Sequence, residues 1–271
     1  MLGQAKRLFE LNSLLNDTKP KVEGAKIISI SSGKGGTGKS FVAGNIAVTL
    51  SEAGSRVLLI DLDLNFANLS TMLNVSSKEN IYHYLTYNKS LSDIIIKSSN
   101  NLNLILGESG KIDHPKFSYE KSELFVGELK SISDQYDFII VDTASGIDSG
   151  SLNVLTSSDE IILVTTPEPT AVMDGYVILK MLKSNGANNS VNVIINKCID
   201  EADATNTFEN LDKAAKHFLK KEISLLGEIS FSEDVVRSIQ KQSLLKLESK
   251  KMKVSAQIEE ISSKIKKQAN G

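Results

Sequence analysis

Cysteine and excess charge are both scarce in this sequence. The single cysteine, Cys198, excludes a disulfide framework. It also excludes zinc and iron–sulfur sites within one chain, because these need several thiolates or added histidines. The formal net charge is −2 at pH 7, so no global basic field draws the chain to nucleic acid. Neither a cluster-based electron carrier nor a broadly basic nucleic-acid binder fits this composition.

Long apolar runs are also missing. No run approaches the roughly 20 residues that a membrane-spanning helix needs. Residues 1–12, MLGQAKRLFELN, carry charges where a signal peptide needs an apolar core. The chain has 271 residues, of which 41% are hydrophobic, and this is enough to bury a sizeable core without metals or disulfides. We expect a cytoplasmic protein built around one large domain.

Short, continuous apolar runs recur along the chain, separated by longer helical patterns. Continuous rather than alternating runs are typical of strands that are buried on both faces of a parallel sheet. The expected strands are 26–31, 56–61, 101–106, 137–142, 160–166 and 191–196, and the expected helices include 39–53, 119–134, 170–184 and 204–220. This alternation predicts an α/β fold with a doubly wound, mostly parallel sheet and helices on both faces. Ligands of such sheets bind at the carboxyl ends of the strands.

Two appendages are expected to flank this body. Residues 1–25 form a polar leader with a small apolar patch, which we interpret as a partner-binding segment. Residues 26–242 form the main domain. Residues 243–271 form a charged segment with the pattern of an amphipathic helix.

The turn after the first expected strand carries the main chemical motif. It reads Gly33, Lys34, Gly35, Gly36, Thr37, Gly38, Lys39, Ser40. The pattern G-x-x-x-x-G-K-[ST] between a strand and a helix indicates a phosphate-binding loop, in which backbone N–H groups and the helix N-terminus point at phosphate oxygens. Lys39 is expected to neutralise the β- and γ-phosphates, and the Ser40 hydroxyl to bind Mg²⁺. The competing interpretation is a glycine-rich turn without a ligand.

Two other expected strands end in carboxylates. One runs into Asp61 and Asp63, and the run DFIIVD ends at Asp142, which is the Walker B pattern of P-loop proteins. Asp142 is expected to hold Mg²⁺ through water, since Mg²⁺ keeps much of its hydration. Residues 143–147 are then expected to sense the γ-phosphate. The alternative for Asp61 and Asp63 is that they cap the helix that follows.

Lys34 makes the loop more specific. The form K-G-G-T-G-K-S, with a lysine near its start, resembles the deviant Walker A motif of the MinD/ParA family of P-loop ATPases. The resemblance covers roughly residues 25–242 and implies ATP with Mg²⁺ as ligands and ATP hydrolysis as the reaction. It also implies an ATP-dependent homodimer in which Lys34 reaches the partner's nucleotide.

The same resemblance implies roles for other residues. Asp63 is expected to position the hydrolytic water, and Asp61 to support the magnesium shell. Asn196 and Pro167 are expected to surround the base, with the Asn196 side chain reading its edge. Phe41, also placed in the nucleotide site, stands where many members have a threonine, so an α-phosphate contact is lost.

Several segments look closest to the flagellar-number regulator branch of the family, called FlhG or FleN. They are VLLIDLDLNFANLSTMLNV, YDFIIVDTASGID, LVTTPEPTAVMDGYVILKML and GEISFSEDVVRSIQKQ. The resemblance implies a switch that regulates flagellar number or placement, with an FlhF-type GTPase and a flagellar C-ring protein or transcriptional regulator as partners. The leader motif that stimulates this GTPase is altered here, because Gly3 replaces its aspartate and Phe9 its arginine.

The C-terminal segment carries one apolar stripe among lysines. Val254, Ile258, Ile261 and Ile265 repeat at i, i+4, i+7 and i+11. A basic amphipathic helix binds reversibly to anionic lipid, and the family has a targeting helix at this end, so the stripe predicts peripheral attachment to the inner face of the cell membrane. The alternative is a helix that packs on the body and buries the same stripe.

Two functions are consistent with these observations. The first is an ATP-switched spatial regulator that cycles between the membrane and flagellar partners. The second is a ParA-type partition ATPase that rides on DNA. The near-neutral charge disfavours the second, because binding along DNA needs a basic surface, and nucleic acid is not an expected partner.

Overall fold

The computed structural model of the chain describes residues 24–64, 67–87, 89–99, 101–110, 115–242 and 252–269. All but the last two residues of the predicted leader lie outside these ranges, and so do residues 243–251 at the start of the predicted C-terminal segment. The predicted partner-binding role of the leader therefore stays a prediction.

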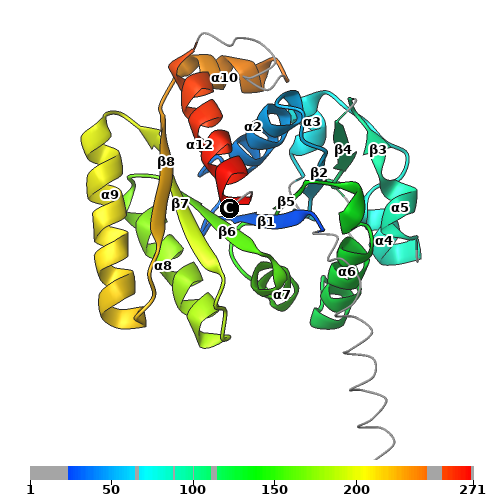
Figure 1. Cartoon of the computed structure of the whole chain (residues 1–271), viewed down its shortest axis with the longest axis horizontal. Helices are drawn as coiled ribbons and strands as arrows, with labels where there is room; N and C mark the ends of the chain where they lie inside the picture. Colours follow the sequence, from blue (N-terminus) through cyan, green and yellow to red (C-terminus); the bar gives the residue numbers. More distant parts are fainter. Residues whose placement is uncertain are drawn as a thin grey trace, which may run out of the picture.

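One sheet forms the centre of the molecule (Figure 1). Its strands are β1 (Lys26–Ser31), β2 (Val57–Asp61), β3 (Ile96–Lys97), β4 (Leu102–Ile105), β5 (Phe138–Asp142), β6 (Glu160–Thr165), β7 (Ser190–Cys198) and β8 (Ser224–Ser230). The spatial order is β3-β4-β2-β5-β1-β6-β7-β8, and every neighbouring pair is parallel except β3 and β4. The predicted fold class, a doubly wound and mostly parallel sheet, is confirmed.

Helices cover both faces of this sheet. They are α2 (Lys39–Glu52), α3 (Leu69–Leu73), α4 (Ile81–Tyr87), α5 (Leu91–Ile94), α6 (Tyr119–Ser131), η1 (Ser133–Gln135), α7 (Ser149–Ser157), α8 (Pro169–Ser184), α9 (Glu201–Ala214), η2 (Ala215–Leu219), α10 (Glu233–Gln240) and α12 (Lys253–Ala269). Helices α2 and α12 share one apolar cluster with the sheet, while α6 and α8 contribute to the clusters on its other face. Polar side chains fix where several helices begin: Ser118 caps α6, Asp148 caps α7 and Asp200 caps α9.

The strands at the two edges of the sheet were not expected from the sequence. β3 has only two residues, too few to give a pattern, and β8 reads SLLGEIS, which interrupts its apolar residues with glycine and glutamate. β8 is only partly buried, so its sequence does not show the continuous apolar run that marks the central strands.

The C-terminal helix corrects one prediction. The stripe of Val254, Ile258, Ile261 and Ile265 is buried, with exposed fractions of 2% or less, and belongs to the same core as α2 and the sheet. Lys264 donates from Nζ to the carbonyl of Leu226 on the edge strand β8 at 3.0 Å. The stripe is therefore no free membrane-binding face, because it fills the space over α2 and β8. This packing fits the alternative weighed for the stripe, and the predicted boundary at 242/243 stays a prediction because residues 243–251 lie outside the described ranges. Among the described residues, no helix is both long enough and apolar enough to cross a membrane.

Candidate functional site

The phosphate-binding loop lies between β1 and α2 at the carboxyl edge of the sheet. Gly36 and Gly38 have φ angles of 82° and 89°, a left-handed conformation that favours glycine. A Cβ atom at Gly38 would collide with the side-chain amide of Asn196. Helix α2 begins after Gly38 without a side-chain cap, so the N–H groups of its first turn are available to an anion.

A buried ion pair lies beneath this loop. Lys39 donates from Nζ to Oδ1 of Asp142 at 2.6 Å, and both side chains are nearly inaccessible to solvent. Burial raises the pKa of Asp142, whereas Lys39 and the Ser40 hydroxyl lower it. Oδ2 of Asp142 and the hydroxyl of Thr37 are buried without a hydrogen-bond partner among the described residues. The loop and the predicted Walker B strand thus meet as the motifs require, and they leave polar atoms for a ligand and a cation.

Asp61 and Asp63 occupy different positions. Asp61 is fully buried, and its two carboxylate oxygens accept N–H groups from Asp63, Asn68 and Leu69 at 3.1 to 3.2 Å. Burial and the nearby Asp142 raise its pKa to about 7. This geometry fits the alternative weighed for Asp61, in which it orders the loop and the start of α3. Asp61 also lies beside Asp142 across the β2–β5 pair, so its predicted support of the magnesium shell stays a prediction.

A cavity of about 650 Å³ opens over the phosphate-binding loop. Its lining includes Asp63, Asn68 and Ser145 as well as the loop from Gly35 to Phe41. The segment that holds Ser145 is tied to the end of β1, because the Gly146 N–H donates to the carbonyl of Ser32 at 2.9 Å. The predicted γ-phosphate sensor therefore lies at the same cavity as the loop and Asp63, which is what phosphoryl chemistry at this edge requires.

Asn196 and Lys197 brace the loop from the end of β7. Asn196 donates from Nδ2 to the carbonyl of Thr37 at 2.7 Å, and its Oδ1 accepts the N–H of Lys197. Lys197 has φ of 61° and donates from Nζ to the carbonyl of Gly36 at 2.7 Å. Both ends of the Asn196 amide are thus used within the protein. The geometry shows a brace, and Asn196 also lines the smaller cavity described next, so its predicted reading of the base edge stays a prediction.

A smaller apolar cavity, of about 240 Å³, adjoins the first. Gly38, Phe41, Lys197 and Ile239 line both cavities, and Phe231, Val235 and Val236 complete the apolar walls of the smaller one. The residues from 231 onward were not assigned from the sequence, since their apolar pattern reads simply as an amphipathic helix. Pro167 lines neither cavity, so its predicted place at the base has no support.

Lys34 does not line its own chain's phosphate cavity. Its Nζ donates to Oε2 of Glu168 at 2.6 Å and to Oγ1 of Thr170 at 2.9 Å, at the start of α8. This neighbour lowers the pKa of Glu168. About a third of the Lys34 side chain is exposed, so it is open to a second molecule at this edge.

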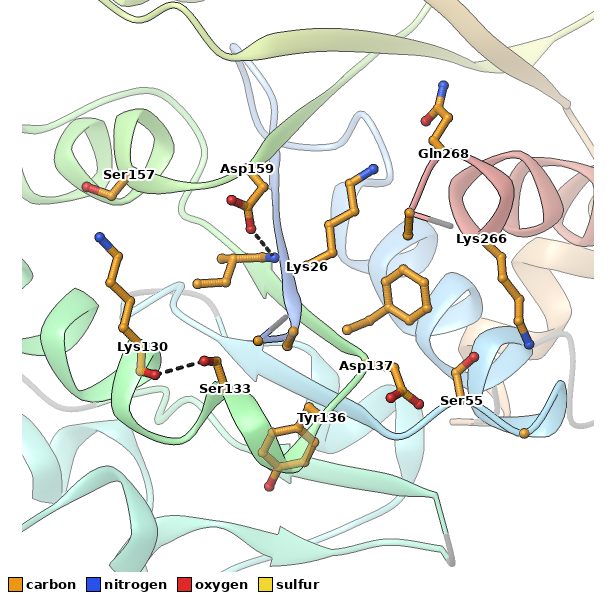
Figure 2. Close-up of a pocket in the computed structure, with 16 residues that line it drawn as sticks. Lys26, Ser55, Lys130, Ser133, Tyr136, Asp137, Ser157, Asp159, Lys266 and Gln268 are labelled. Atoms are coloured by element: carbon orange, nitrogen blue, oxygen red, sulfur yellow. Dashed lines mark hydrogen bonds between the residues drawn. The ribbon is translucent and has the colours of Figure 1, made fainter. Parts of the chain in front are cut away.

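A further cavity lies at the opposite edge of the sheet and is a different site. Figure 2 shows its lining, which includes Lys26, Asp159 and Lys266, around a volume of about 700 Å³. Two of its charged groups are already bonded within the protein: Asp159 accepts the N–H of Ile27, and Lys266 donates to the carbonyl of Ala53. None of the predicted site residues lines it.

The fold and the loop define a class of protein. A phosphate-binding loop between β1 and α2, with its lysine paired to an aspartate on the adjacent strand β5, is the site of a P-loop nucleotide hydrolase. The comparisons narrow this class. A family model described as an AAA domain matches residues 25–193. The chain belongs to the MinD/ParA family of P-loop ATPases, which confirms the predicted family and the predicted reaction, ATP hydrolysis.

Two relatives and one solved structure represent this similarity. The chain is 33% identical over 253 residues to the flagellum site-determining protein YlxH of Helicobacter pylori, covering 91% of this chain and 84% of that one. It is 29% identical over 217 residues to the antiactivator FleN of Pseudomonas aeruginosa, covering 80% and 78%. The structure of the septum site-determining protein MinD from Pyrococcus horikoshii, complexed with Mg-ADP, matches with a TM-score of 0.74 at 26% identity, over 90% of this chain and 97% of that one.

Proposed function

We propose that this chain is an ATP-operated dimeric switch that sets the number or placement of flagella. The observation that carries the proposal is the similarity to the flagellum site-determining protein YlxH, which extends over 91% of the chain. The antiactivator FleN is similar over 80% of the chain. A site that hydrolyses ATP beside an outward-facing Lys34 suits a switch whose state depends on the bound nucleotide.

We infer that ATP occupies the two adjoining cavities, with its triphosphate over the loop and its base in the smaller cavity. The triphosphate lies along the loop, where backbone N–H groups and the α2 dipole stabilise its charge, and Lys39 exchanges part of its contact with Asp142 for phosphate oxygens. The base enters the apolar cavity against Phe41 and Phe231, where flat aromatic surface stabilises it. Asn196 contributes indirectly by holding the carbonyl of Thr37 and thereby the shape of the loop.

Mg²⁺ suits the polar atoms that the loop and β5 bring together. Ser40 and Asp142 would hold it, because Mg²⁺ prefers oxygen ligands. The Oδ2 atom of Asp142 is buried and has no hydrogen-bond partner among the described residues, so it is available to the ion. When bound, the ion supplies charge stabilisation to the phosphates. Asp63 lines the cavity from the end of β2 and orients the attacking water.

Lys34 supplies the two-chain part of the site. Its ammonium group lies outside its own phosphate cavity and at an exposed edge. In an ATP-bound homodimer it leaves Glu168 and Thr170 and neutralises the partner's phosphates, much as an arginine finger does. A flagellar C-ring protein, a transcriptional regulator and an FlhF-type GTPase are the expected partners of this dimer.

The dimer is further expected to associate with the inner face of the cell membrane. The stripe on α12 does not make this contact in the described conformation, because it is part of the core. Another surface must therefore meet the lipid, or α12 must leave the body at the cost of exposing that core.

The test of this function is to delete the gene and count flagella per cell. A changed number or position, restored by the wild-type gene but not by a Lys39→Ala variant, is the expected result. A normal flagellar count with loss of plasmids or chromosomes would refute the proposal and favour the ParA-type partition function instead.

A further inference from the structure

An extra residue near the end of β7 aims a lysine at the phosphate-binding loop. Asn196 pairs with Ile229 on the neighbouring strand β8, and Cys198 pairs with the very next residue there. Lys197 is therefore the extra residue of a β-bulge, a device that re-aims a side chain and recurs next to active sites. Its φ angle of 61° is left-handed, a conformation that is unfavourable for residues other than glycine.

The bulge decides on which face of the sheet Lys197 lies. Side chains alternate along β7, because Ile194 belongs to the core shared with α2 and Ile195 to the core on the opposite face. A regular strand would place Lys197 with Ile195, away from the loop. Cys198 takes that inward place instead, and Nζ of Lys197 donates to the carbonyl of Gly36 at 2.7 Å. The bulge thus brings a second side chain of β7 to the phosphate-binding loop.

Lys197 lies where the two cavities of the nucleotide site meet. The residues that line both cavities are Gly38, Phe41, Lys197 and Ile239. Of these four, only Lys197 has a polar side chain. The other cation in the lining of the two cavities is Lys39, whose Nζ is paired with the buried Asp142. The junction of the cavities therefore carries one ammonium group beside glycine and apolar side chains.

The ammonium group of Lys197 keeps donors for a ligand. It carries three N–H donors, and among the described residues its one hydrogen-bond acceptor is the loop carbonyl named above. Lys34 and, more weakly, Lys197 lower the pKa of Glu168, but the carboxylate of Glu168 is bonded to Lys34 at 2.6 Å. Asp200 and Asp203, which follow in the chain, accept backbone N–H groups at the start of α9.

We propose that Lys197 binds the α-phosphate of the nucleotide. The inference rests on the placement of ATP given under Proposed function, with the base in the smaller cavity and the β- and γ-phosphates near Lys39. The ribose and the α-phosphate then occupy the junction of the cavities. An ammonium group bonds more strongly to an anionic phosphate oxygen than to a neutral hydroxyl, and the Phe41 side chain offers the α-phosphate no polar atom.

Two substitutions of Lys197 separate its charge from its bracing of the loop. Lys197→Gln keeps an N–H donor for the Gly36 carbonyl and loses the charge, whereas Lys197→Gly loses both and accepts the left-handed φ. Each variant is expected to bind ATP and ADP about tenfold more weakly than the wild type, by the same factor because both nucleotides carry the α-phosphate. Isothermal titration calorimetry of the full chain measures the affinities.

Lys220 supplies the matched control. It is also an exposed lysine with a left-handed φ, of 50°, and it lines neither nucleotide cavity. Lys220→Gln and Lys220→Gly are expected to leave both affinities unchanged. They control for the loss of a surface charge and for the relief of a left-handed backbone.

Sulfur substitution of the nucleotide identifies the phosphate group. One diastereomer of ADPαS carries sulfur in place of the oxygen that Lys197 contacts. Without Mg²⁺, this diastereomer is expected to bind the wild type about fivefold more weakly than ADP does, the effect of one weakened hydrogen bond. With Lys197→Gln it is expected to bind as well as ADP, because that contact is already lost.

The outcomes separate this inference from the proposed function. If Lys197→Gln binds both nucleotides as the wild type does, Lys197 at most braces the loop and the α-phosphate assignment is wrong. If Lys197→Gln instead removes the difference between ADP and an ADP analogue without ribose hydroxyls, Lys197 holds the ribose and the assignment is again wrong. In both cases the ATP site stands. If the wild-type chain binds neither nucleotide, the placement of ATP fails as well, whereas the flagellar count tests the switch independently.

Discussion

At the scale of single residues, a substitution of Lys34 tests whether the ATP site is built from one chain or from two. Because it does not line its own phosphate cavity, Lys34→Ala is expected to keep ATP binding and to lose dimerisation or to slow hydrolysis by more than about a hundredfold, as removal of an arginine finger does. Equilibrium ATP binding, size-exclusion chromatography and phosphate release measure the three properties. Lys39→Ala, which removes the lysine buried beneath the loop, serves as the control that loses binding. Hydrolysis at the wild-type rate in Lys34→Ala would show that the trans role is wrong.

Asn196 allows a second distinction at this scale. Its amide holds the carbonyl of Thr37, so Asn196→Ala is expected to lower the affinity for ATP and for GTP by the same factor of about ten, since it loosens the loop that both triphosphates share. Titration with each nucleotide measures this. A changed ratio of ATP to GTP affinity would instead support the role first predicted from the sequence, in which Asn196 reads the base.

At the scale of elements, α12 is part of the core. Ile258 is fully buried between α2 and β8, so Ile258→Ala is expected to lower the free energy of unfolding by about 3 kcal/mol, as the removal of buried methyl groups does. Urea denaturation of the full chain measures this change. The matched control is Ser263→Ala on the exposed face of the same helix, with an expected change within about 0.5 kcal/mol. Equal stability of the two variants would mean that α12 is only loosely docked.

Helix α9 shows why the exposed face of an element is harder to predict than the element itself. The apolar spacing predicted a helix over 204–220, and α9 with η2 spans Glu201–Leu219. The same spacing places Phe218 inside, yet the π-helical turn places it outside. Periodicity assumes a regular helix, and one extra residue in a turn rotates the side chains that follow by about 100° around the helix axis.

At the scale of the whole molecule, the predicted switch depends on two chains. Asp63 lines the phosphate cavity and is the expected guide of the hydrolytic water, so Asp63→Ala is expected to bind ATP, hydrolyse it at least about a hundredfold more slowly, and accumulate as a dimer. Size-exclusion chromatography with light scattering in ATP, and in ADP as the control, measures the state. A monomer in saturating ATP would contradict the dimeric switch.

The sequence alone determined the class of this protein. A phosphate-binding loop, a Walker B strand and continuous apolar strands are local patterns, because each depends on backbone conformation and burial over a few consecutive residues. They led to the sheet, to the P-loop and to the family. They also placed the loop and the end of β5 at one edge of the sheet, since parallel strands end there, whereas the ion pair between Lys39 and Asp142 was not predicted.

Only the tertiary structure decided the features that depend on contacts between distant segments of the chain. An apolar stripe on α12 fits lipid and protein equally well, and the space over α2 and β8 decides that it is buried. The partners of Asp61 and Asn196 depend on which N–H and carbonyl groups other segments bring near. The same holds for the phosphate-binding loop. Its motif predicts ATP, whereas only the contacts of Lys34 with α8 place that lysine outside its own cavity, at an edge open to a second chain.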